Sequence, residues 1–419
     1  MAVIKPFRAY RPIPGLASQV ASLPYDVMNS DEARKMAQEN PYSFLHVIKA
    51  EIDLPSTTDS HASEVYKTAR DNLDTLMAHG VLEQDQAECL YLYKQIMGDH
   101  VQVGLVVCTA VDDYLNGVIK IHEHTRPDKE QDRIRYTDSC DANTGLIFLT
   151  YRSQQDVNTI ISSWMKTHEP AADFQSDDGI QHTIWTIDNE QVIATLVAAF
   201  DRLDSLYVAD GHHRTASAAK VGQMRREQHP DYQGDEPFNY FLSVLIPNDQ
   251  LYIMDYNRVI EDLNGLSDEE FLQRVERSFD IHPQSHAYKP QQPHHFGMYF
   301  GGTWYQLVVK PGIYDEYDPI GRLDVTILQN HILSPILGVS DPKTDTRIDF
   351  VGGIRGLEEL EKRLEDGMRV AFALYPTSIS DVMSVADAGK VMPPKSTWFE
   401  PKVRSGLFVH TLSKDGESS

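Results

Sequence analysis

Residues 207–220, YVADGHHRTASAAK, place an aspartate, a glycine, two histidines and an arginine between an apolar stretch and a run of small residues. The pattern predicts a strand that stops at an Asp-Gly turn and a helix that begins directly after it. Backbone N–H groups and the positive end of the helix dipole would then face one point, which favours an anion. Gly211 would let the backbone approach a phosphate, and Arg214 would add a forked donor. An alternative interpretation is that Asp210 only caps the helix and leaves the other polar side chains exposed.

A second group of charged residues lies in IHEHTRPDKEQDRIRY, residues 121–136. It could supply acid or base groups, a carboxylate for magnesium and cations that hold phosphate. A simpler interpretation is a solvated helix in which Thr125 and Asp128 form a capping pair and Pro127 occupies the first turn. The spacing of its histidines lacks the HExxH arrangement of zinc proteases, so a zinc site is not expected.

A third segment, VMPPKSTWFEPKVRSG at residues 391–406, gathers lysines and an arginine in an acidic chain. Its two prolines stiffen a loop that could close over an anionic ligand, with Trp398 as an apolar wall. The alternative is a surface loop that pairs with the abundant carboxylates. Walker A and GxGxxG sequences are both absent, so any nucleotide would be held by another architecture.

Local patterns predict the elements that position these segments. Asn29 and Glu32 resemble a capping box for a helix over residues 30–40, and Gly80 would end a helix over residues 63–80. Two apolar segments at residues 89–97 and 100–111 read as a hairpin. Further strands and helices follow without sustained alternation, which favours an α+β fold with mixed sheets and hairpins over a doubly wound parallel sheet.

Composition sets broad limits on partners and location. The chain has 419 residues and a formal net charge of −24, which repels nucleic acid and anionic membranes. Its three cysteines, Cys89, Cys108 and Cys140, form no CxxC pair, and no apolar run is long enough to cross a bilayer. We therefore expect a cytoplasmic protein with no nucleic-acid or membrane partner, and a homodimer is left open.

The length exceeds what one hydrophobic core usually organises. We predict a phosphate-binding lobe over residues 1–255, a second α+β lobe over residues 256–413 and a disordered tail at 414–419.

The chain also resembles a known family along most of its length. Nine phrases in order are similar to the domain of unknown function 1015 family: PYDV, NPYSFLHV, HEHTRPDKEQDRIR, YVADGHHRTASAA, DYNRVI, LDVTILQNHIL, DFVGGIRGLEELE, AFALYP and VMPPKSTWFEPKVRSGLFVH. That family name implies no established activity.

A more distant resemblance covers only ADGHHR. It is similar to the phosphate-gripping motif of the ParB/sulfiredoxin-like fold, which includes partition CTPases, sulfiredoxin and free-serine kinases. The resemblance implies a nucleotide-binding core, with phosphates near the Asp-Gly-x-His-Arg residues that the serine kinases share. Sulfiredoxin has a cysteine inside this loop, and none occurs between Asp210 and Arg214, so sulfiredoxin activity is disfavoured.

Together these observations predict phosphoryl transfer on a small hydroxylated metabolite, with serine or phosphoserine as the first candidate. A phosphoserine hydrolase and a nucleotide-binding switch without turnover are the alternatives. The expected cofactors are Mg²⁺, with unassigned ligands, and ATP or ADP; the expected partner is a small anionic metabolite or a nucleotide. The candidate catalytic groups are Glu123, Asp210 and His213; the phosphate-binding candidates are Gly211, His212, Arg214, Arg133, Lys129, Lys395, Ser396 and Thr397; the substrate-binding candidates are Trp398, Lys402 and Arg404.

Overall fold

The computed structural model describes residues 2–413 and divides the chain into two compact units. Unit 1 contains the described residues up to Leu251 together with those from Pro401 onward, and unit 2 is Tyr252–Glu400. The sequence-based division placed residues 401–413 in the second lobe. They pack with unit 1 because Ser405 exchanges backbone hydrogen bonds with Ser22. The tail expected at 414–419 lies outside the described residues.

Unit 1 is built on a mixed sheet. Among the described residues this sheet has nine strands, in the order β6-β11-β8-β12-β5-β4-β10-β9, with β1 paired to β5. The β6–β11 and β8–β12 pairs are parallel and the other pairs are antiparallel. The strands of unit 1 are β1 Ile4–Lys5, β2 Tyr10–Pro12, β3 Leu82–Gln84, β4 Leu90–Met97, β5 His100–Ala110, β6 Ile119–Lys120, β7 Ala142–Asn143, β8 Ile147–Tyr151, β9 Ala172–Gln175, β10 Gln181–Ile187, β11 Leu206–Asp210, β12 Tyr240–Pro247 and β21 His410–Thr411.

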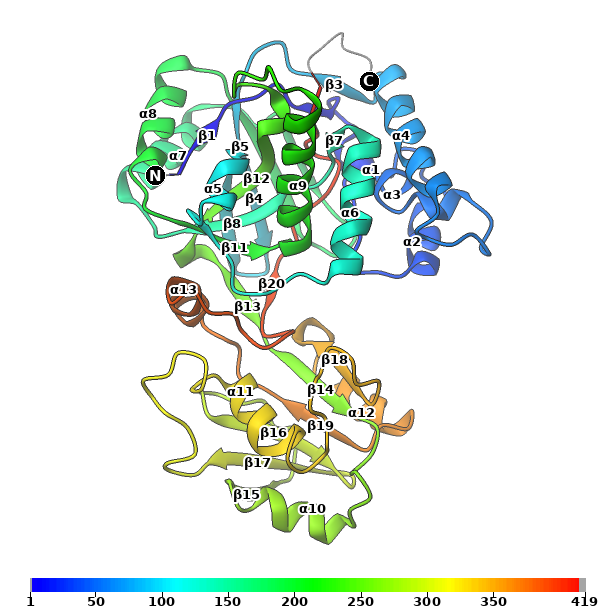
Figure 1. Ribbon diagram of the computed structural model, residues 1–419, viewed down its shortest axis with the longest axis vertical. Helices are drawn as coiled ribbons and strands as arrows, with labels where there is room; N and C mark the ends of the chain where they lie inside the picture. The colour runs from blue at the N-terminus through cyan, green and yellow to red at the C-terminus, as the bar shows by residue number, and fades with distance from the viewer. Residues whose placement is uncertain (1, 414–419) are drawn as a thin grey trace. The chain divides into compact units, whose positions relative to one another are not determined.

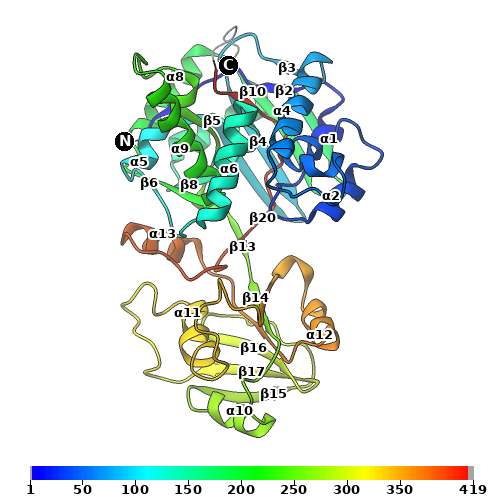
Figure 2. The same cartoon turned by 45° about the vertical axis from the view of Figure 1, so that its right-hand side comes forward.

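Helices α6 and α9 lie side by side in both views of unit 1 (Figures 1 and 2). Arg225 of α9 joins them through an ion pair to Asp138 of α6 at 2.9 Å. The two helices begin at the same end of unit 1, because Arg126 before α6 bonds His213 of α9. The second and first sequence motifs therefore meet there. The helices of unit 1 are α1 Ala17–Val20, α2 Ser30–Ala37, α3 Leu45–Ile48, α4 Ser63–Ala78, α5 Val111–Leu115, α6 Pro127–Cys140, α7 Gln155–Thr167, α8 Glu190–Asp201 and α9 His212–Gln228.

Several local predictions for unit 1 are confirmed. Asn29 and Glu32 form the capping box at the start of α2, because each side chain bonds the other residue's backbone N–H. Helix α4 ends two residues before Gly80, which has a φ of +66°. Strands β4 and β5 form the predicted hairpin, with Met97 opposite His100.

Two apolar clusters hold unit 1 together. In one, side chains of α7 and α8, such as Trp164 and Phe200, pack with strand residues such as Leu149 and Val208. In the other, helices α2, α3 and α4 pack together and against Tyr136 of α6. The second cluster therefore fixes α6 from the side opposite α9.

Unit 2, all of whose residues are described, has a six-stranded antiparallel sheet in the order β15-β17-β16-β19-β14-β18 and a short ribbon of β13 and β20. Its strands are β13 Tyr252–Met254, β14 Tyr256–Ile260, β15 Phe279–Gln284, β16 His295–Phe300, β17 Thr303–Val309, β18 Ile348–Gly352, β19 Val370–Ala373 and β20 Trp398–Glu400. Its helices are α10 Asp268–Val275, α11 Asp324–Leu328, α12 Glu358–Glu365 and α13 Ile379–Asp387.

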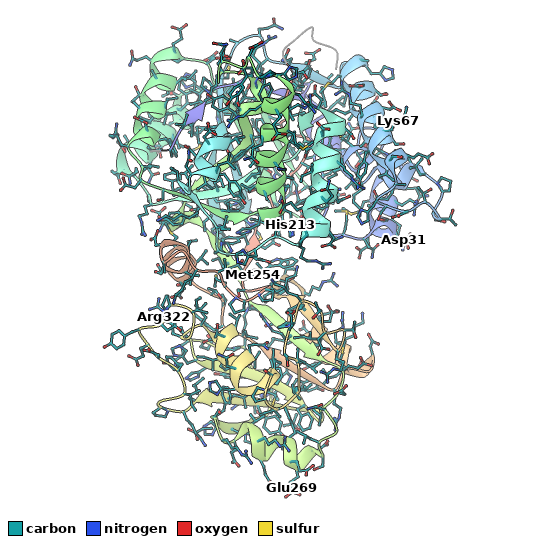
Figure 3. All side chains as sticks on the ribbon, in the orientation of Figure 1. Asp31, Lys67, His213, Met254, Glu269 and Arg322 are labelled. Atoms are coloured by element: carbon teal, nitrogen blue, oxygen red, sulfur yellow. The ribbon has the colours of Figure 1, made fainter. Side chains whose placement is uncertain are left out.

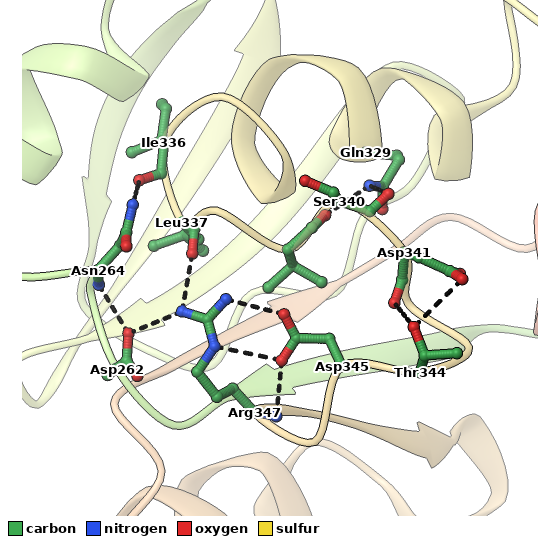
Figure 4. Close-up of polar contacts among 11 residues, drawn as sticks. Asp262, Asn264, Gln329, Ile336, Leu337, Ser340, Asp341, Thr344, Asp345 and Arg347 are labelled. Atoms are coloured by element: carbon green, nitrogen blue, oxygen red, sulfur yellow. Dashed lines mark hydrogen bonds and ion pairs between the residues drawn. The ribbon is translucent and has the colours of Figure 1, made fainter.

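A polar network fixes the loop that precedes β18 in unit 2. The guanidinium of Arg347 bonds Asp345 at 2.8 Å, Asp262 at 3.2 Å and the carbonyl of Leu337 at 3.1 Å (Figure 4). One planar side chain thus ties three loops together, as forked donors do. The structure confirms the α+β class for both units. No helix among residues 2–413 has both the length and the apolar character needed to span a bilayer.

Candidate functional site

The first motif forms the predicted strand-to-helix connection. Strand β11 ends at Asp210, Gly211 adopts a φ of +91°, and α9 begins at His212. The N–H of Thr215 is bonded to the carbonyl of Gly211 at 2.9 Å. The N–H groups of the three residues before it therefore have no acceptor within the helix, which leaves a positive helix end. The small residues Ala218 and Ala219 are buried, so α9 lies close to the sheet.

Asp210 is not the N-cap of α9. Gly211 holds that position, and one carboxylate oxygen of Asp210 accepts the N–H of Gly211 at 2.9 Å. The other oxygen lies 3.1 Å from the ammonium of Lys402. Burial alone would raise the pKa of Asp210, but the positive charges of Lys402 and Arg214 outweigh it and hold the pKa well below its usual range.

Arg214 lies in the first turn of α9, and only one of its three guanidinium nitrogens makes a hydrogen bond to another described residue. Its Nη1 donates to the carbonyl of Leu146 at 2.6 Å. Its Nε and Nη2 are buried and have no hydrogen-bond partner among the described residues. A Cβ on Gly211 would come within 3.1 Å of Nε, so the absence of a side chain there makes room for the guanidinium. Two buried, unsatisfied cationic donors are costly unless a ligand accepts them.

Two buried histidines lie beside this turn. The rings of His122 and His212 meet edge to face, with centroids 4.5 Å apart. Burial lowers the pKa of His122 to about 4 and holds the pKa of His212 well below its usual value. A proton on His122 would lower the pKa of His212 further. Both are therefore neutral at pH 7. His212 is 8% exposed, and its Nε2 has no partner among the described residues.

The second motif meets the first at α6. The backbone N–H of Arg126, the N-cap of α6, donates to Nε2 of His213 at 3.0 Å, and Figure 3 labels His213 at the start of α9. The proposed Thr125–Asp128 capping pair is not formed. Thr125 instead bonds Glu130 at 2.6 Å, and Asp128 pairs with Arg126. Pro127 does occupy the first turn, as predicted.

The remaining candidates of the second motif lie on different parts of α6. Glu123 is half-buried in the loop between β6 and α6, and Lys129 is half-buried in the first turn of α6. Arg133 lies one turn further on, bonded to Asp132 at 2.8 Å. It stacks over Tyr25 at 4.2 Å from the ring centroid.

A small cavity of about 40 Å³ separates Arg133 from Arg214. Sequence reasoning missed most of its wall, which comes from distant parts of the chain. Two family phrases, PYDV and the end of KVRSG, contain the missed residues Tyr25 and Ser405 and were the available signal. The lining residues are Tyr25, Ile48, Arg133, Tyr136, Thr137, Asn143, Thr144, Gly145, Ile147, Arg214, Ala218 and Ser405.

The third motif is divided between the units. Its last part returns to unit 1, where Lys402 reaches Asp210. The Arg404 side chain is buried elsewhere, bonded to Ser176 at 3.2 Å and paired with Asp178. The chain thus brings Lys402, but not Arg404, to the first motif.

The first part of the third motif belongs to unit 2. Lys395 is exposed with a φ of +58°, and Arg258 bonds its carbonyl at 2.9 Å. The hydroxyl of Ser396 donates to the carbonyl of Pro393 at 2.6 Å. Thr397 is half-buried, and the indole N–H of Trp398 donates to Glu400 at 2.7 Å. The ligand roles of these four residues stay predictions.

A metal centre among the described residues would need side chains that could together coordinate the ion. Within residues 2–413, no three His, Cys, Asp or Glu side chains are arranged to hold a metal ion. Asp210 is the carboxylate at the first motif, and Lys402 already neutralises it. The role of Mg²⁺ therefore stays a prediction.

Fold and site together define an α+β protein whose first unit carries a strand-loop-helix turn with two buried, unpartnered guanidinium nitrogens. A family model described as "Protein of unknown function (DUF1015)" matches residues 4–326, and the chain belongs to that family. The match ends before the last three phrases that carry the resemblance in the sequence, which start with DFVGGIRGLEELE. A search of curated proteins gave no significant match.

Several solved structures are distantly similar. SbnI with a C-terminal truncation, from Staphylococcus aureus, has a TM-score of 0.41 and 13% identity over 74% of this chain and 90% of its own. A mutant free serine kinase in complex with AMP has a TM-score of 0.39 and 11% identity over 74% of this chain and 92% of its own. A conserved hypothetical protein from Pyrococcus furiosus has a TM-score of 0.36 and 13% identity over 74% and 95%. Matches this distant assign neither activity nor ligand to this chain.

Proposed function

We propose that unit 1 binds the phosphate of a small hydroxylated metabolite or nucleotide at the beginning of α9 and that the protein catalyses phosphoryl transfer there. Serine or phosphoserine is the first substrate candidate, and ATP or ADP, with Mg²⁺, is the partner in the exchange. The observation that carries the proposal is Arg214, whose Nε and Nη2 are buried without an acceptor beside a positive helix end.

The binding step follows from the local geometry. Gly211 has no side chain to shield the backbone, so a phosphate oxygen can approach the first N–H groups of α9. Arg214 supplies charge-assisted donors, and the uncharged His212 can share a proton with a further oxygen through Nε2. Arg133 and Lys129 remain candidates for additional phosphate contacts from α6.

In the transfer step the metabolite hydroxyl oxygen bonds to phosphorus, the bond from phosphorus to the nucleotide oxygen breaks, and the hydroxyl proton leaves. The low pKa of Asp210 makes it a poor proton acceptor at pH 7, so we assign it to orienting the hydroxyl by a hydrogen bond. Glu123 is the candidate proton acceptor, and His213 can act as one only when its Nε2 releases the N–H of Arg126. Such transfers depend mainly on positioning and charge, and the first motif supplies both.

The test is phosphorus NMR of the full chain with Mg²⁺, incubated with serine plus ATP or ADP and, separately, with phosphoserine. We expect nucleotide-dependent gain or loss of phosphoserine. Free phosphate from phosphoserine alone would indicate a hydrolase instead, and nucleotide binding without any new signal would indicate a switch.

The variant that tests the site is Arg214→Ala, with Lys220→Ala as the matched control. Lys220 is an exposed cation on the same helix. We expect Arg214→Ala to abolish turnover while the melting temperature changes little, because the substitution also removes two unsatisfied buried donors. A collapse of thermal stability in Arg214→Ala alone would mean that the motif is structural.

A further inference from the structure

The cavity between Arg133 and Arg214 is a second feature that lies within unit 1. None of its lining residues is an aspartate or a glutamate, although the chain carries a net charge of −24. Two guanidinium groups share its wall with the hydroxyl-bearing side chains of Tyr25 and Ser405. The guanidinium groups can only donate, whereas the hydroxyls can donate or accept, so the two arginines favour a ligand that accepts hydrogen bonds.

The two arginines differ in how their charges are balanced. Asp132 offsets Arg133 through ion-pair contacts at 2.7 and 2.8 Å. No carboxylate of the described residues lies within ion-pair distance of Arg214. One of the two guanidinium groups in the wall therefore has no ion-pair partner, while the charge of the exposed Asp26 acts on the wall residue Tyr25. A single unpaired guanidinium can be matched by one carboxylate.

The wall also holds donors in place. Arg133 is sandwiched between Tyr25 and Tyr136, with ring centroids at 4.2 and 4.5 Å. Its Nη1 makes no hydrogen bond to another described residue, whereas Nε and Nη2 are bonded to Asp132. Gly145 brings the wall close, because a Cβ there would lie 3.3 Å from the Ser405 hydroxyl and 3.7 Å from Nη1 of Arg214. The two rings and Asp132 hold Arg133 in place before any ligand arrives, which favours binding.

The volume limits what can enter. About 40 Å³ holds roughly three waters at about 10–15 Å³ each. A carboxylate group fits this space, but a whole amino acid does not. The ligand must therefore place only its anionic end in the cavity.

We propose that this cavity holds the carboxylate of the substrate, so that the substrate is a small hydroxy acid. Its hydroxyl or phosphate reaches the beginning of α9, and Arg214 lies between the two anionic groups. The position of the phosphate rests on the proposed function, whereas the preference of the cavity for a carboxylate does not. Arg133 is thereby assigned to the carboxylate.

The experiment is calorimetric titration of the full chain with phosphoserine, with phosphoethanolamine, which lacks the carboxylate, and with inorganic phosphate. We expect phosphoserine to bind about tenfold more tightly than phosphoethanolamine, as one added charged hydrogen-bond pair gives. In Arg133→Lys, which keeps a charge beside Asp132 but loses the fork, this ratio should fall towards one while the Kd of inorganic phosphate stays within about twofold.

Two further variants keep the test decisive. Ser405→Ala removes a wall hydroxyl without adding volume and should lower the same ratio, which covers the case in which Arg133→Lys does not fold. Arg135→Lys changes an exposed arginine on the same helix and should leave the ratio unchanged. Equal binding of phosphoserine and phosphoethanolamine to the unmodified chain would overturn the proposal. The proposal would also be overturned if Arg133→Lys weakened the binding of inorganic phosphate by the same factor as the binding of phosphoserine. The cavity would then hold the phosphate.

A formate titration separates this inference from the proposed function. If no phosphate compound binds, phosphate binding at α9 fails, but formate should still raise the melting temperature saturably in the unmodified chain and not in Arg133→Lys. If formate has no such effect and no phosphate compound binds, both proposals fail.

Discussion

Asp210 keeps its charge in a half-buried position because the Lys402 ammonium lies 3.1 Å away. A carboxyl whose pKa is lower in the folded than in the unfolded chain binds fewer protons when folded, so it stabilises the fold above its unfolded pKa of about 3.9. That contribution is lost as the pH falls through the lower folded-state value. We expect Asp210→Asn to lower the free energy of unfolding at pH 7, with the difference shrinking below about pH 4.

Urea unfolding between pH 7 and pH 3 checks this prediction. Asp204→Asn, at an exposed position before β11, is the control for the substitution itself. An Asp210→Asn difference that stays constant down to pH 3 would mean that the ion pair is not its source.

The buried pair of imidazoles has its own pH signature. Because burial lowers the pKa of His122 to about 4, the folded chain binds fewer protons than the unfolded chain once the pH falls below about 6.5. Stability should therefore decline from pH 6.5 to about pH 4 and then level for this group. We expect His122→Asn to make the unfolding free energy depend less steeply on pH in this range. The reduction in slope should correspond to at most one proton. The exposed His124 provides the control, and an unchanged slope in His122→Asn would refute a neutral buried imidazole.

At the scale of the element, the turn between β11 and α9 depends on one glycine for two reasons. Gly211 has a φ of +91°, and a Cβ there would meet the Arg214 guanidinium at 3.1–3.2 Å. Gly234 has a similar φ of +98° but no atom within 4 Å of a Cβ. The two positions therefore separate backbone strain from contact with Arg214.

We expect Gly211→Ala and Gly234→Ala each to lose about 1–2 kcal/mol of unfolding free energy from left-handed backbone strain. Only Gly211→Ala should also lose phosphate binding, because it displaces the guanidinium of Arg214. Thermal unfolding and phosphate titration of the two variants check this. Equal phosphate affinities in both would show that Arg214 does not need this close approach.

The same elements show which features the sequence could predict. The strand-turn-helix at Gly211 and the capping box at Asn29 are written in residues a few positions apart, so local rules were sufficient. The cavity was not predictable in this way, because Tyr25, Gly145 and Ser405 meet only after the sheet and helices have formed. The Thr125–Asp128 cap failed for a related reason: tertiary contacts gave Arg126 the N-cap position and drew its N–H to His213.

At the scale of the whole molecule, unit 2 is one uninterrupted segment, and unit 1 is formed by the chain on both sides of it. The ends of unit 2 are paired, with Tyr252 opposite Glu400 in the β13–β20 ribbon. Paired antiparallel residues lie about 4.5–5.5 Å apart, so two glycines can join Leu251 to Pro401. Unit 1 also contains both apolar clusters described above and every residue of the first motif.

We therefore expect a chain in which two glycines replace Tyr252–Glu400 to fold and to retain inorganic phosphate binding. Circular dichroism, cooperative thermal unfolding and phosphate titration measure this outcome. The full-length variants Lys395→Ala and Trp398→Ala provide the comparison, since they test the predicted ligand roles in unit 2 without removing it. Loss of phosphate binding in a folded shortened chain would place an indispensable phosphate ligand in unit 2. Retained binding together with lost phosphoryl transfer would instead confine the role of unit 2 to the transfer step.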